Sequence, residues 1–230
     1  MTAPILHYLY DPLCGWCYGA APLLRAARDV LPVRPRSGGM MAGARRQAVT
    51  PQLRAYVQPH DQRIAQLSGQ PFGPAYTDGL LRDNGAVFDS EPPTAAMLAA
   101  EQLAGRGLDM LARLQVAHYE EGRRIAEPSV LVELAASLGL DAAAFAETLT
   151  QLSGEAVQAH FRDTREFMAR VGAQGFPTFV LETAEGLQSI DVSAYLGRPQ
   201  AFQERLRQRA GLPAASAAQA LGCGFDGCAL

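Results

Sequence analysis

Two cysteines separated by two residues, Cys14 and Cys17, lie where a short strand-like segment meets the start of a helix. Residues 5–10 before them are apolar and β-favouring and end at a turn, while residues 15–30 after them carry apolar side chains at helical spacing. Residues 33–37 predict a second strand. The N-terminal part is therefore expected to form a βαβ unit with a right-handed crossover.

The position of the two cysteines makes them candidates for thiol chemistry. A sulfur at the first turn of a helix faces unpaired backbone N–H groups, which favour the thiolate. Cys17 lies one turn after Cys14 on the same face, so the two sulfurs can meet with little backbone change. Cys14 is the candidate nucleophile and Cys17 the candidate resolving thiol of a mixed disulfide. Trp16, between them, is expected to tune the redox potential and to contact substrate.

A zinc site and a purely structural role are the alternatives for this pair. The two cysteines could be half of a zinc site that Cys223 and Cys228 or a histidine complete, or they could be incidental buried cysteines. The second pair lies in a Gly-rich tail, whereas zinc-binding pairs usually sit on knuckle turns. The strand-to-helix position of the first pair therefore favours redox chemistry, and we expect neither a metal ion nor another cofactor.

Composition limits the partners and the compartment. The 230 residues are 48% hydrophobic and 19% charged, which is typical of a soluble globular protein. A net charge of −3 does not provide the basic surface of a nucleic-acid-binding protein, and no apolar run reaches the roughly 18 residues of a membrane span. The N-terminus shows no export signal. We therefore expect a cytoplasmic protein, where structural disulfides are rare.

The middle of the chain is expected to be helical. From residue 42 to residue 171, apolar residues recur at helical spacing and strand signals are nearly absent. Thr50-Pro51 is typical of a helix start, with threonine as the N-cap and proline at the first helical position. This segment therefore predicts an all-α lobe.

Strand signals return near the C-terminus. Residues 178–182 and 187–190 predict a hairpin, and residues 194–209 predict a final helix over the sheet. Pro177 directly precedes the first of these strands. A cis proline there would leave the backbone of Phe176 free to pair with an extended substrate. On local sequence alone a trans bond is favoured, because cis bonds make up only about 5–6% of X–Pro bonds.

Two motifs carry a family resemblance, YDPLCGWCYG at residues 10–19 and GFPTF at residues 175–179. Together they resemble the DsbA-like thioredoxin-fold family, and most closely its cytoplasmic branch of predicted protein-disulfide isomerases. The resemblance spans nearly the whole chain and implies an α/β class, a thioredoxin fold with a large inserted all-α lobe. The expected parts are a discontinuous thioredoxin domain at 2–41 and 172–210, the lobe at 42–171, and a flexible tail at 211–230.

The resemblance also implies roles for individual residues. Cys14 would be the exposed nucleophile, Cys17 the buried resolving thiol and Pro177 the cis-proline of the substrate groove. Pro22 matches the proline that kinks the active-site helix in thioredoxin-fold enzymes. Cys223 and Cys228 are similar to the C-terminal Cys-x4-Cys of FrnE-type members of the family, which implies a second redox pair; two accidental exposed thiols are the alternative.

The predicted function is that of a thiol–disulfide oxidoreductase. In a reducing compartment an oxidised pair would be converted mostly to the dithiol, which favours a disulfide reductase or isomerase over an oxidase. The expected partners are protein or small-molecule disulfides and thiols, with glutathione or thioredoxin-type reductants. The oligomeric state is open.

A glutathione-dependent enzyme is the alternative function. Kappa-class glutathione transferases and 2-hydroxychromene-2-carboxylate isomerases share the expected fold, but they carry a serine where Cys14 stands. Among other polar residues, Asp11 is expected to form a turn rather than to transfer protons, and Arg45-Arg46 is expected on a solvated face.

Overall fold

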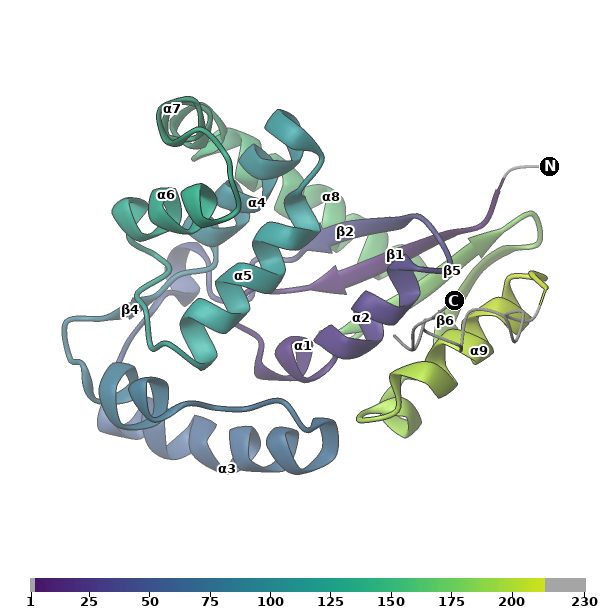
Figure 1. The fold of residues 1–230 in the computed structure, drawn as a ribbon, viewed down its shortest axis with the longest axis horizontal. Coiled ribbons are helices and arrows are strands. Elements are labelled where there is room, and N and C mark those ends of the chain that lie inside the picture. Colours follow the sequence, from purple (N-terminus) through teal and green to yellow (C-terminus); the bar gives the residue numbers. More distant parts are fainter. Residues whose placement is uncertain (1–2, 214–230) are drawn as a thin grey trace, which may run out of the picture.

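A four-stranded sheet lies at the centre of the structure, a computed structural model that describes residues 3–213 (Figure 1). Its strand order is β2-β1-β5-β6. The strands are β1 (Ile5–Tyr10), β2 (Val33–Ser37), β5 (Thr178–Thr183) and β6 (Gly186–Ile190). β1 pairs with β2 in parallel and with β5 antiparallel, and β5 and β6 form an antiparallel hairpin. The predicted βαβ unit and hairpin are both confirmed.

The strand positions follow from their side chains. β1 is buried almost throughout and takes a central place, whereas β2 contains Pro35, which cannot donate to a ladder, and lies at an edge. β6, whose residues are mostly exposed, forms the other edge.

Helices cover both faces of the sheet (Figure 1). One face carries α1 (Gly15–Gly19), α2 (Ala21–Arg28) and α9 (Pro199–Arg209), and α8 (Glu155–Val171) packs on the other. The single helix expected over residues 15–30 is in fact two helices, because Pro22 in the first turn of α2 has no N–H to continue α1. The last helix begins later than expected, at Pro199, after the left-handed Gly197.

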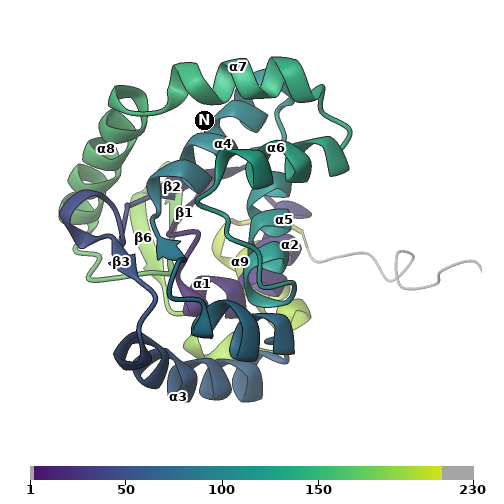
Figure 2. The same ribbon diagram turned by 90° about the vertical axis from the view of Figure 1, so that its left-hand side faces the viewer.

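Between β2 and β5 the chain is mainly helical, as predicted (Figure 2). Its further helices are α3 (Pro51–Ser68), α4 (Glu91–Ala104), α5 (Gly107–Tyr119), α6 (Pro128–Ser137) and α7 (Ala142–Leu152). Thr50 caps α3 by accepting the Leu53 N–H at 3.1 Å. The sequence missed a short two-stranded ribbon of β3 (Gln47–Ala48) and β4 (Val87–Phe88). The division of the chain into a thioredoxin domain at 2–41 and 172–210, a helical lobe at 42–171 and a tail at 211–230 stays a prediction.

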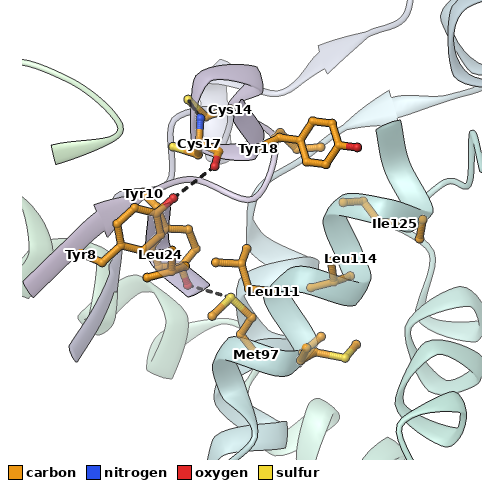
Figure 3. Packing of buried hydrophobic residues seen from close by; sticks show 14 of the residues in the cluster. Tyr8, Tyr10, Cys14, Cys17, Tyr18, Leu24, Met97, Leu111, Leu114 and Ile125 are labelled. Carbon is orange, nitrogen blue, oxygen red and sulfur yellow. Dashed lines mark hydrogen bonds between the residues drawn. The ribbon is translucent and has the colours of Figure 1, made fainter. Parts of the chain in front are cut away.

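One hydrophobic core joins the sheet to the inserted helices (Figure 3). The stacked rings of Tyr8 and Tyr10 lie 5.2 Å apart on β1. The Tyr8 hydroxyl donates to the carbonyl of Cys17 at 3.3 Å, and the Tyr10 hydroxyl donates to the sulfur of Met97 on α4. The Tyr8 hydrogen bond therefore fixes the turn that carries the cysteines to strand β1. None of the helices within residues 3–213 is long and apolar enough to cross a membrane.

Candidate active site

The two cysteines lie at the start of α1, directly after β1. Cys14 is the N-cap residue, and its sulfur accepts the backbone N–H of Cys17 at 3.4 Å. Its S–H donates to the carbonyl of Phe176 at 3.6 Å, from the loop before β5. Both cysteines are free thiols. The N–H and the carbonyl fix the position of the Cys14 sulfur between the start of α1 and the loop before β5.

Cys14 is less open than expected. The resemblance predicts an exposed nucleophile, but only 6% of Cys14 is accessible. Phe176 from one side and residues of α3 from the other narrow the opening above it. Cys14 still lines a cleft of about 600 Å³, so a substrate can approach its sulfur from one direction.

Cys17 has the environment of a resolving thiol. It is completely buried behind Cys14. Burial raises the pKa of the Cys17 thiol well above its usual range, and the neighbouring Cys14 raises it further. A thiol held in its protonated form in this way suits the resolving role that the sequence predicts for Cys17.

The walls of the cleft come from distant parts of the chain. Trp16 and Phe176, which the sequence predicts to contact substrate, both line it; Pro177 is not among the lining residues, and the Phe176–Pro177 bond is cis. The lining also includes apolar side chains, among them Met40, Met41, Tyr56 and Val57, and polar side chains, among them Arg45, Arg46, His60 and Asp61. The sequence did not identify the polar set as part of the site.

Gly38 leaves the room that the Phe176 ring occupies. A Cβ at Gly38 would lie 2.1 Å from Cζ of Phe176, so the ring would have to move. Gly38→Ala is expected to lower kcat/KM for disulfide reduction about tenfold, because Phe176 shapes the cleft and its carbonyl contacts Cys14. Steady-state kinetics would measure this. Gly79→Ala, where a Cβ meets nothing within 4 Å, is the control, and equal losses in both variants would contradict the assignment.

Asp11 holds the loop that carries the cysteines. Its carboxylate accepts the Leu13 N–H at 2.9 Å, which is the turn that the sequence predicts. It also accepts the Met40 N–H at 2.6 Å and the Ser90 hydroxyl at 2.9 Å. Burial raises the pKa of Asp11, and the two N–H groups and the hydroxyl oppose that shift. Asp11 therefore connects the cysteine loop to one wall of the cleft and to the start of α4.

Two arginines meet beside the cleft. Arg45 donates to the carbonyl of Gly39 at 2.7 Å, and Arg165 of α8 donates to the same oxygen at 3.3 Å and to the carbonyl of Gly38 at 3.2 Å. Within residues 3–213 neither guanidinium forms an ion pair, whereas Arg46 pairs with Asp89. Arg45 therefore does more than lie on a solvated face: it places a positive charge with free donors at the edge of the cleft.

Comparison with known proteins identifies the family. The profile of the DSBA-like thioredoxin domain matches residues 5–197. The chain belongs to this family. Among solved structures, the cytosolic disulfide reductase DsbM from Pseudomonas aeruginosa is 60% identical, with a TM-score of 0.84 over 89% of this chain and 98% of that one. The structure of that protein with GSH is 58% identical, with a TM-score of 0.84 over 90% and 100% of the two chains. Among curated proteins no match was found.

Membership of the DSBA-like family confirms the predicted thioredoxin fold and the predicted class, a thiol–disulfide oxidoreductase. A 2-hydroxychromene-2-carboxylate isomerase matches at 20% identity, with a TM-score of 0.54 over 91% of this chain and all of that one. That likeness shows the fold alone.

Metal binding finds no support in the part of the chain that the structure describes. There, no group of three or more His, Cys, Asp or Glu side chains is placed to hold an ion. A zinc site shared by the two cysteine pairs would need Cys223 and Cys228, which lie outside the described residues, as does the possible second redox pair.

Proposed function

We propose that this protein reduces disulfides in the cytoplasm through Cys14 and Cys17, and that a small thiol such as glutathione regenerates the dithiol. The observation that carries the proposal is the arrangement of the pair: Cys14 lines a cleft, and a fully buried thiol lies directly behind it. The relative at 60% identity is named a cytosolic disulfide reductase, which supports both the direction of the reaction and the compartment expected from the sequence.

The reaction moves two electrons from the cysteines to the substrate. The Cys14 thiolate attacks one sulfur of the substrate disulfide, forms a mixed disulfide and expels the other half as a thiolate. Cys17 loses its proton and attacks the sulfur of Cys14, which releases the second half and leaves a Cys14–Cys17 disulfide. Two glutathione thiols then reduce that disulfide in the same two steps and leave as glutathione disulfide.

Reduction of hydroxyethyl disulfide by glutathione tests this function directly. The wild-type protein is expected to accelerate it far above the uncatalysed exchange. A rate equal to that without protein would contradict the proposal. Thiol trapping and mass spectrometry across a glutathione redox series would show in addition whether Cys223 and Cys228 form the second pair that the resemblance implies or are two accidental thiols.

We propose that Arg45 binds one carboxylate of glutathione. Glutathione carries two carboxylates, and the structure of DsbM with GSH shows that a relative binds this thiol. Arg45 lines the cleft and has no acidic partner within residues 3–213. Guanidinium groups bind carboxylates in a directional way, and Arg165 adds a second positive charge on the same carbonyl oxygen.

Arg45→Gln is expected to raise the KM for glutathione about fivefold, which corresponds to ~1 kcal/mol for a solvent-exposed ion pair. The KM for 2-mercaptoethanol, which has no carboxylate, should stay unchanged. Arg46→Gln is the matched control, because Arg46 already pairs with Asp89. Steady-state kinetics with the two thiols provides the measurement, and an equal rise in KM for both thiols would show that Arg45 acts only on the shape of the cleft.

A further inference from the structure

Asp61 of α3 lies directly against the cysteine motif. A Cβ on Gly15 would be 3.1 Å from Oδ1 of Asp61, and a Cβ on Gly19 would be 2.6 Å from Cγ2 of Ile64. The two glycines therefore let α3 approach the backbone of α1 closely. This approach brings a carboxyl group with only 7% exposure next to the residue that follows Cys14.

Asp61 also lies between two cavities. It lines the cleft that contains Cys14, and it lines a second cavity of about 380 Å³. The other lining residues of that second cavity are mainly polar, and they include Gln58, Gln62, Thr77 and Asp78. A proton on Asp61 can therefore pass to a group in the cleft, and it can be replaced from water on the other side.

The surroundings of Asp61 hold its carboxyl group near the balance between its two forms. The Tyr76 hydroxyl donates to Oδ2 at 3.0 Å, and no guanidinium or ammonium group pairs with Asp61 within residues 3–213. Burial raises the pKa of Asp61 to about 7, while the Tyr76 hydrogen bond opposes that shift. The other titratable groups that face it are His60 on α3, Cys14 on α1, Tyr119 on α5, Arg45 and Arg46 across the cleft, and Asp78 beside the second cavity.

We propose that Asp61 is the proton donor and acceptor for the substrate thiols in the cleft, an inference that rests on the proposed reductase function. When the Cys14 thiolate attacks a disulfide R–S–S–R′, the S–S bond breaks and a Cys14–S–S–R bond forms. The departing R′–S⁻ takes the proton of Asp61 and leaves as R′–SH, and Asp61 becomes a carboxylate. Asp61 is then protonated again from water in the second cavity.

Asp61 also acts in the half of the cycle in which glutathione reduces the Cys14–Cys17 disulfide. There it accepts a proton instead of donating one. A glutathione thiol in the cleft gives its proton to the Asp61 carboxylate, and the resulting thiolate attacks the sulfur of Cys14. The Cys14–Cys17 bond breaks, and the electron pair goes to Cys17 as a thiolate. General acid–base catalysis is most efficient when the group titrates near the working pH, and Asp61 meets that condition.

Two neutral disulfides whose leaving thiols differ in pKa can show whether Asp61 transfers a proton or only supports the structure of the site. Hydroxyethyl disulfide releases an ordinary alkyl thiolate, which needs a proton, whereas 4,4′-dithiodipyridine releases a thiol of low pKa that leaves without one. In single-turnover reactions of the reduced protein, Asp61→Asn is expected to lower the ratio of the first rate to the second at least about tenfold. Asp29→Asn is the control, since Asp29 lies exposed at the end of α2 and lines neither cavity; its ratio should not change.

The pH profile gives an independent readout. In the wild type the ratio of the two rates should fall as the pH rises through about 7, where Asp61 loses its proton, and in Asp61→Asn it should not depend on pH. Tyr76→Phe should move the midpoint to higher pH, because it removes a hydrogen bond that favours the carboxylate.

Several results would overturn the proposal. An Asp61→Asn variant that slows both disulfides equally, or slows neither, would exclude proton transfer by Asp61. So would a ratio that keeps its dependence on pH in that variant. Alkylation of Cys14 by iodoacetamide must not fall in Asp61→Asn, which confirms that the nucleophile is intact. Failure of the reductase function itself looks different, because the wild type would then reduce hydroxyethyl disulfide no faster than an ordinary free thiol does.

Discussion

Cys14→Ser is expected to reduce disulfide turnover to at most about a thousandth of the wild-type rate. The serine hydroxyl keeps its proton at neutral pH and cannot form the mixed disulfide, although it fits the N-cap position that Cys14 occupies. The fold should therefore survive while the chemistry is lost. Steady-state reduction of hydroxyethyl disulfide by glutathione measures the rate, and circular dichroism checks the fold.

Cys17→Ser should instead stop the cycle halfway. Cys14 can still attack, but no second thiol lies behind it to resolve the product. When the reduced variant reacts with a substrate disulfide in the absence of glutathione, a mixed disulfide between Cys14 and the substrate should accumulate. Peptide mapping by mass spectrometry would locate it and exclude Cys223 and Cys228. Wild-type turnover in Cys14→Ser, or a trapped adduct at another cysteine, would refute the assigned roles.

Asp11→Ala should destabilise the protein by about 3 kcal/mol or more. The carboxylate is fully buried and accepts from Leu13, Met40 and Ser90, so its removal leaves three donors without a partner in the interior. Urea unfolding, followed by circular dichroism, measures the loss.

Asp191→Ala provides the matched control for that experiment. Asp191 also accepts the N–H two residues ahead, from Ser193 at 2.9 Å, but it is exposed to water. Water can replace the lost bond there, so the expected loss is below about 1 kcal/mol. Similar losses at the two positions would show that Asp11 forms a simple turn, as the sequence alone suggests.

The parts of the fold that the sequence predicted are those with strong local patterns. The β1 strand and the hairpin of β5 and β6 contain β-favouring runs, and Thr50-Pro51 marks the start of α3. The ribbon of β3 and β4 has two residues in each strand, which is too short for any periodic signal. The break between α1 and α2 follows from Pro22, which on sequence alone is expected only to kink a continuous helix.

The residues of the site likewise fall into those that a sequence motif predicts and those that it does not. Cys14, Trp16 and Cys17 share one motif, and Phe176 belongs to a recognisable run before a strand. Asp61, Arg45 and Arg165 belong to no such motif; they lie on α3, on the loop after β2 and on α8, and only the tertiary fold brings these elements to the cleft. The low exposure of Cys14 depends on the same packing.

The hydrogen bonds of Ser90 connect one wall of the cleft to the turn that carries Cys14. Ser90 donates to Asp11 and accepts the Met41 N–H at 3.0 Å, so the loop at one wall of the cleft is bonded to the cysteine turn. Swinging this wall outward would break several buried hydrogen bonds at once. This wall of the cleft is therefore held in place beside Cys14, so a substrate that enters meets a surface already arranged around the sulfur.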